Sequence, residues 1–159
     1  MRAIGLRAAP KRVWFSVVES SDTDDQISLL VSQSLAIPVA LTPPEQLRFI
    51  RQTIADTIDE YGSTRAGIRL AEPIAQHMSL ERLHIEGVLQ ELLASSPVQC
   101  YFYGAIAKMA SLLGVEARAD VKQFIEGRAF RGIPGWAQMA SEQRESILAA
   151  VAALAVALP

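Results

Sequence analysis

The stretch TPPEQLRFIRQTIADTIDEYG, residues 42–62, is where the hydrophobic pattern of the chain becomes helical. Thr42 and Glu45 have the spacing of a capping box, and prolines are tolerated in a first helical turn because their missing N–H groups have no helical partner there. Apolar residues then recur at helical spacing, and Gly62 is a typical helix terminator. The stretch predicts a helix from Thr42 to Tyr61.

Three strands are predicted before this helix. Ala3–Leu6, Val13–Val18 and Gln26–Ile37 are apolar or alternating runs. The breaker Ala8–Pro10 and the polar stretch 20–25 separate them. Short turns between strands are typical of an antiparallel meander, so we expect the three strands to pair in that way.

After the helix, strands alternate with helices. We predict a strand over Arg65–Ala71, in which Gly67 is a weakness, and a strand over Val98–Tyr103 that is apolar enough to be covered on both faces. Helices are predicted over Ser79–Ala94, 104–113, 120–126 and from Ser141 onwards. No repeat or linker divides this order, and we therefore expect a single α/β domain over residues 1–159.

The composition is that of a folded domain with little net charge. Half of the residues are hydrophobic and the net charge is −2, so no global basic charge points to nucleic acid. The single cysteine, Cys100, excludes an internal disulfide and predicts a buried thiol in a reducing, cytoplasmic location. No signal peptide is evident. The apolar run Ile147–Leu158 is shorter than the roughly 20 residues of a membrane span, so we expect a buried helix.

The order of elements resembles the ribonuclease-H-like fold, above all its Holliday-junction-resolvase branch. That family opens with a strand reading roughly IGIDPG, and Ile4–Ala9 of this chain reads IGLRAA. Its last helix contains ADALAIA, and Glu145–Leu154 reads ESILAAVAAL. The resemblance implies a mixed five-stranded sheet of order 3-2-1-4-5 flanked by helices.

Two further segments carry the resemblance. Ile106–Ile125 is similar to the lysine-bearing helix, glycine break and following helix of the resolvases, with Lys108 and Lys122 as the matching lysines. Ile68–Leu93 is similar to a small bacterial family of unknown function that is thought to share the fold.

The resemblance also implies that the acidic metal site of these nucleases is degraded here. Their first-strand aspartate binds a catalytic metal pair, and Arg7 stands in its place. Their fourth-strand glutamate corresponds to Arg69 or, in a shifted register, to Glu72. We favour Arg69 because Ile68 supplies the expected hydrophobic neighbour. Their last-helix aspartate corresponds to Glu145.

A guanidinium has no lone pair to give a metal, whereas two-metal hydrolysis needs several converging carboxylates. We therefore predict no catalytic residue, no cofactor, and a non-catalytic binding or scaffolding domain. Arg7 and Arg69 are expected to pair with Glu72 or Glu145, which we favour, or to bind an external phosphate or carboxylate. The alternative is a divergent Mg- or Mn-dependent nuclease or junction resolvase that uses Glu72, Glu145 and Asp120.

The loop GRAFRGIPGW, residues 127–136, combines arginines with aromatic residues. Phe130 and Trp136 could anchor the loop to the core, or the loop could contact a protein or stack on nucleic-acid bases. Because the chain is slightly acidic, we expect nucleic acid to bind weakly at most. The candidate ligand-binding residues are Lys108, Lys122, Arg128 and Arg131.

The remaining polar motifs favour structural roles. Asp22, Asp24 and Asp25 lack the glycine and terminal glutamate of a calcium loop and predict a solvated turn. His77 and His84 have no metal-binding spacing.

The C-terminal helix predicts the assembly. It has no polar face after Ser146, and its alanines favour close helix packing. We expect the sheet and the helix over 42–61 to cover only part of it, which leaves a surface for a symmetric homodimer through residues 141–158 or for an unknown protein partner.

Overall fold

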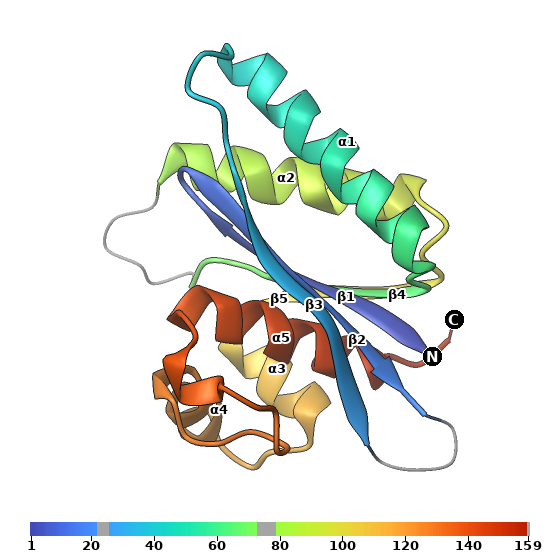
Figure 1. The fold of residues 1–159 in the computed structure, drawn as a ribbon, viewed down its shortest axis with the longest axis vertical. Helices are drawn as coiled ribbons and strands as arrows, with labels where there is room; N and C mark the ends of the chain where they lie inside the picture. The colour runs from blue at the N-terminus through green and yellow to red at the C-terminus, as the bar shows by residue number, and fades with distance from the viewer. Residues whose placement is uncertain (22–25, 73–78, 159) are drawn as a thin grey trace.

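The computed structural model describes residues 1–21, 26–72 and 79–158, and Figure 1 shows their arrangement. The strands are β1 Arg2–Ala9, β2 Arg12–Ser20, β3 Ile27–Ala36, β4 Arg65–Arg69 and β5 Cys100–Gly104. The helices are α1 Pro43–Tyr61, α2 Leu80–Ser95, α3 Ile106–Leu113, α4 Arg118–Glu126 and α5 Ser141–Leu154, with a short 3₁₀ turn over Trp136–Gln138.

The five strands form one mixed sheet of order β3-β2-β1-β4-β5, as predicted. β1, β2 and β3 pair antiparallel, whereas β4 lies parallel to β1 and β5 parallel to β4. Helices α1 and α2 cover one face of the sheet, and α3, α4 and α5 lie on the other (Figure 1). The fold is therefore a three-layered α/β arrangement with a separate hydrophobic core on each face.

The first helix begins and ends at the predicted residues. The backbone N–H and the hydroxyl of Thr42 donate hydrogen bonds of 2.8 and 2.6 Å to the Glu45 carboxylate. These two hydrogen bonds hold the pKa of Glu45 below its usual value. Gly62 closes the helix with a left-handed φ of 59°, which glycine adopts without a Cβ clash.

The prediction that the last strand is covered on both faces is wrong. β5 is an edge strand in which Cys100 and Phe102 are buried, while Tyr101 and Tyr103 are 37% and 55% exposed. An apolar run of this length fits either environment, because tyrosine can leave its hydroxyl in water while part of its ring packs.

Gly67 is a structural requirement, although its position within a strand suggested a weakness. Gly5 of β1 and Gly67 of β4 are register partners, and α5 crosses directly over them. A Cβ on Gly5 would lie 1.9 Å from the carbonyl oxygen of Ser146, and one on Gly67 would lie 2.5 Å from that of Ala149. The two glycines together make a groove for the helix backbone.

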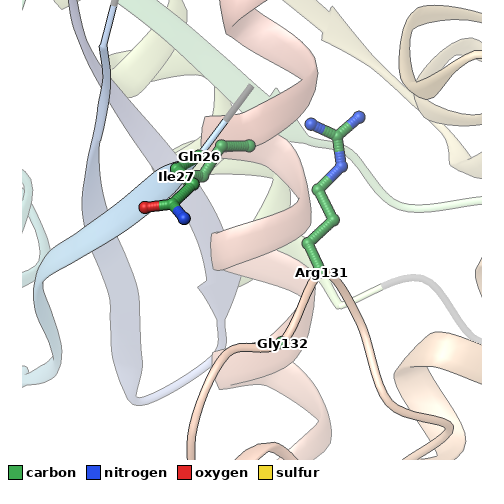
Figure 2. A pocket seen from close by; sticks show the side chains of 4 residues that line it. All are labelled: Gln26, Ile27, Arg131 and Gly132. Atoms are coloured by element: carbon green, nitrogen blue, oxygen red, sulfur yellow. The ribbon is translucent and has the colours of Figure 1, made fainter. Parts of the chain in front are cut away.

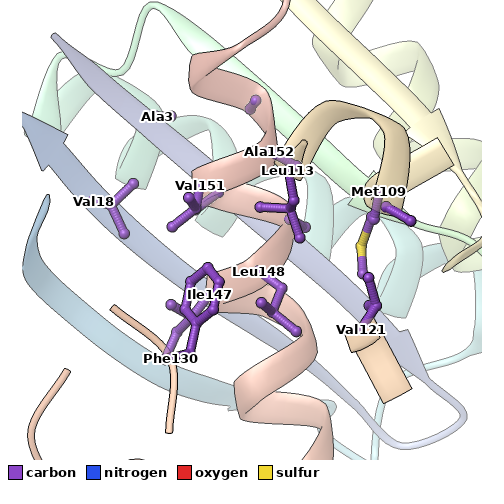
Figure 3. Close-up of a cluster of buried hydrophobic side chains, with 14 of the residues drawn as sticks. Ala3, Val18, Met109, Leu113, Val121, Phe130, Ile147, Leu148, Val151 and Ala152 are labelled. Atoms are coloured by element: carbon purple, nitrogen blue, oxygen red, sulfur yellow. The ribbon is translucent and has the colours of Figure 1, made fainter. Parts of the chain in front are cut away.

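The apolar α5 is enclosed by its own chain. Ile147 and Leu148 are fully buried, and Val151 is 4% exposed. Figure 3 shows these side chains gathered with Met109 of α3 and with other side chains from α4 and from the loop that precedes α5. The helix ends at Leu154, earlier than the predicted apolar run, and Leu158 beyond it is 64% exposed. From Arg144 to Ala153 the expectation that part of the helix stays uncovered is wrong. The expected contact with α1 is also wrong, because α1 packs on the opposite face. The apolar character of α5 therefore supplies no argument for a dimer through residues 141–158.

None of the helices within the described ranges combines the length and the apolar character needed to cross a membrane.

We predict that Gly5→Ala lowers the free energy of unfolding by about 2 kcal/mol or more, because the new methyl group would press on the α5 backbone. Gly87→Ala is the matched control. Nothing lies within 4 Å of a Cβ on Gly87, which sits within α2, and this change should stabilise the protein by about 1 kcal/mol. Urea unfolding measures both, and equal midpoints for the two variants would contradict the tight helix–sheet contact.

Candidate functional site

The two arginines at the degraded-site positions lie side by side. Arg7 and Arg69 are register partners at the ends of β1 and β4. They follow Gly5 and Gly67 by two residues, and alternate residues of a strand share a face, so both arginines lie on the α5 face of the sheet. Their side chains are only 12% and 6% exposed.

Glu145, in the second turn of α5, lies between the two guanidinium groups. Its Oε2 accepts a hydrogen bond of 2.8 Å from Arg7 Nε and lies 3.0 Å from Arg69 Nε. The second contact is an ion pair without hydrogen-bond geometry, since Arg69 Nε has no hydrogen-bond partner among the described residues. The expected internal pairing of these residues is therefore present.

Glu72 completes the pairing beyond the end of β4. Its Oε1 lies 2.9 Å from Arg69 Nη2 and accepts a hydrogen bond of 3.1 Å from the backbone N–H of Ile106, the first residue of α3. One arginine thus bridges Glu72 and Glu145, the two carboxylates that were candidates for a metal site.

A fourth ion pair next to these residues, between Arg82 and Glu86, was missed from the sequence. Arg82 Nε donates a 2.7 Å hydrogen bond to Glu86, whose Oε1 also accepts the backbone N–H of Ala71 at 2.9 Å. Burial lowers the pKa of Arg82, and the positive charge of nearby Arg7 lowers it further. The spacing of an arginine and a glutamate four residues apart on a helix was the available signal.

These residues form one set that we call the arginine–glutamate network: Arg7, Arg69, Arg82, Glu72, Glu86 and Glu145. The formal charges of the three arginines and three glutamates cancel. Buried charges are stable in a protein when they are paired and hydrogen-bonded in this way. The network joins β1, β4, α2, α5 and the start of α3.

The network does not fit a magnesium or manganese pair. The residues that the structure describes contain no group of three or more His, Cys, Asp or Glu side chains that could hold a metal ion. Glu72 and Glu145 are both engaged by Arg69, and Asp120 lies 3.6 Å from Arg128 instead. A cation would have to displace buried guanidinium groups to reach Glu145, and to bind Glu72 and Glu145 together it would have to displace Arg69.

The candidate ligand-binding residues do not converge on the network. Exposed Lys108 is the closest in the fold, because its side chain borders Gly104, the register partner of Arg69. Lys122 is exposed on α4. The Arg128 guanidinium donates a hydrogen bond to Gln123 and is paired with Asp120.

Arg131 lies at the other end of the sheet. With Gln26, Ile27 and Gly132 it lines a pocket of about 650 Å³ (Figure 2). Ile27 of β3 pairs with Ser20 of β2, which lies beside the start of β1. Arg7 lies near the end of β1, in register with Trp14 of β2. The pocket and the network are therefore at opposite ends of these strands.

The aromatic residues of the loop over 127–136 are buried. Phe130 is 4% and Trp136 3% exposed, and their rings are 5.3 Å apart. The indole N–H of Trp136 donates a hydrogen bond to the Phe124 carbonyl. Of the three interpretations of this loop, anchoring to the core accounts for both aromatic side chains.

The other polar candidates stay outside the network. His84 is exposed on α2, and Cys100 is buried as a free thiol. The acidic turn with Asp22, Asp24 and Asp25 lies outside the described residues, as does His77.

No family model and no curated protein matches this sequence. Solved structures do match. Thermus thermophilus RuvC superposes with a TM-score of 0.71 over 96% of this chain and 92% of RuvC, at 12% sequence identity. The chain has the ribonuclease-H-like fold of RuvC. T. thermophilus RuvC in complex with a Holliday junction substrate matches over the same shares of both chains with a TM-score of 0.64 and 12% identity.

A viral relative of this fold matches less closely. The fowlpox virus Holliday junction resolvase has a TM-score of 0.50 and 9% identity over 96% of this chain and 94% of its own. The superpositions establish the RuvC-like fold. Because the sequence identities are this low, the activity has to be inferred from the residues of the site.

We predict that Glu145→Gln lowers the free energy of unfolding by about 3 kcal/mol, because it leaves two buried guanidinium groups without their shared counter-charge. Glu91→Gln is the control, since Glu91 pairs with Arg51 on the surface, where solvent screens the charges, and its loss should change the free energy of unfolding little. Urea unfolding of the two variants measures the difference. A Glu145→Gln variant as stable as the wild type would contradict a paired, buried network.

Proposed function

We propose that this chain is a non-catalytic protein of the RuvC-like fold that acts by binding or scaffolding and does not hydrolyse phosphodiesters. The observation that carries the proposal is the position of the Glu145 carboxylate between the guanidinium groups of Arg7 and Arg69. Arginine stays protonated at any physiological pH and offers no lone pair, so it cannot serve as a metal ligand or as a general base.

The electrostatics support the same proposal. Two-metal hydrolysis places two divalent cations about 4 Å apart among hard oxygen ligands. Here the positive charges of three arginines already balance the available carboxylates. Further positive charge at this position would meet repulsion in a region with little water, where charges are poorly screened.

The second candidate is a divergent metal-dependent nuclease or junction resolvase, and the fold itself favours it. The matched structures include a resolvase and a RuvC bound to a Holliday junction substrate. Glu72 and Glu145 lie close enough to share Arg69, so a rearrangement of this one side chain would bring two carboxylates to a cation.

A divalent-cation experiment separates the two candidates. We expect the wild-type protein to show no micromolar Mn²⁺ binding by calorimetry and no cleavage of a four-way DNA junction with Mg²⁺ or Mn²⁺. The double variant Arg7→Asp, Arg69→Glu should gain Mn²⁺ binding, because it places two carboxylates beside Glu145 and Glu72. Adding Glu145→Gln should abolish that gain. Mn²⁺ binding by the wild type that Glu145→Gln removes would overturn the non-catalytic proposal.

We also expect weak binding of duplex or four-way-junction DNA at physiological salt. The net charge is −2, Arg128 is paired with Asp120, and Arg131 lies at the far end of the sheet from the network. Fluorescence anisotropy over a range of salt concentrations tests this, because each phosphate contact steepens the salt dependence. Sub-micromolar affinity with a steep slope that is lost in Arg128→Ala, Arg131→Ala would favour the resolvase candidate instead.

A further inference from the structure

β3 is a long strand at the edge of the sheet, and no other described strand pairs with its outer side. It spans ten residues at the end of the sheet, and among the described residues its only backbone ladder is with β2. Its sequence, ISLLVSQSLA, contains no charged residue and no proline. Natural edge strands usually carry such residues or a β-bulge to prevent pairing. The bulge of β3 lies at Leu30, so the absence of charges and proline over Val31–Ala36 points to a strand partner there.

The side chains along β3 are symmetric in type about Gln33. Ser32 and Ser34 flank it, followed on either side by Val31 and Leu35. The pattern continues outward with apolar residues in both directions, at Leu29, Leu30, Ala36 and Ile37. A strand that pairs antiparallel with a copy of itself about a two-fold axis at Gln33 therefore places serine opposite serine and aliphatic opposite aliphatic.

Apolar side chains on both faces of β3 are only partly buried. Ile27 and Leu29 pack against the core under α5, whereas Val31 and Leu35 pack against the core under α1 and α2. Leu30, which is 38% exposed, sits in a bulge without a partner in β2. About an axis at Gln33 this bulge limits regular pairing to Val31–Leu35, and a second strand paired there would cover Val31 and Leu35.

We propose that β3 is the interface for a second copy of this chain, and that antiparallel pairing of the two β3 strands joins the two mixed sheets into one continuous sheet. The symmetry of the strand points to a second copy of this chain as the partner, because a different partner would not need a strand sequence that is similar in both directions. Gln33 is exposed in the single chain, and its amide carries both donors and an acceptor. At the two-fold axis the two Gln33 amides bond to each other. The interface uses no residue of the arginine–glutamate network and stands independently of the proposed function.

Charge substitution at the axis tests the interface. Wild-type protein should sediment as a dimer at micromolar concentration. Gln33→Lys and Gln33→Glu should each weaken the dimer by roughly tenfold or more, because like charges then face each other across the axis. An equimolar mixture of the two variants should recover the dimer, because opposite charges now meet. Circular dichroism and urea unfolding confirm that each variant is folded.

Gln138→Lys is the matched control, since it makes the same change of charge at an exposed residue of the 3₁₀ turn and should leave the dimer intact. A monomeric wild type would overturn the proposal. So would a dimer that Gln33→Lys leaves unchanged, or a mixture of the two charged variants that stays monomeric.

Discussion

The close approach of α5 to the paired glycines of β1 and β4 is the contact on which the rest of the structure depends. Any side chain at Gly5 would collide with the helix backbone at Ser146 and Ala150. With glycine at both positions, the backbone of α5 can pack directly against the backbone of β1 and β4. The buried alanines of α5 allow similarly close packing on its other sides. This arrangement buries the whole helix from Arg144 to Ala153.

The same approach fixes the electrostatics of the site. Glu145 immediately precedes Ser146, whose carbonyl lies over Gly5. Its carboxylate therefore lies beside Arg7 and Arg69, the next pair of strand residues that face α5. A carboxylate held this close to two guanidinium groups at low exposure is stabilised by charge and hydrogen bonding together. In this chain the crossing of α5 over β1 and β4 therefore presents a carboxylate to two arginines.

The network also connects α2 and α3 to β4, with which these two helices share few other contacts. Arg69 reaches α3 through Glu72, while Glu86 on α2 accepts the backbone N–H of Ala71 just beyond β4. Paired charges of this kind contribute less to stability than their number suggests, because desolvation offsets much of their attraction. Their geometric effect is larger: they hold the ends of β1 and β4 against helices on both faces of the sheet.

The sequence by itself determined the order of elements, the capping of α1 at Thr42 and the identity of Arg7, Arg69, Glu72 and Glu145 as one group, since periodicity and motif resemblance are local properties of the chain. Only the tertiary structure decided which elements cover α5, that Gly67 is required, that β5 is an edge, and that Arg82 and Glu86 join the network. Each of these depends on distances between residues far apart in the chain, and a pattern of hydrophobicity carries no information about which partner a buried face or a buried charge will meet.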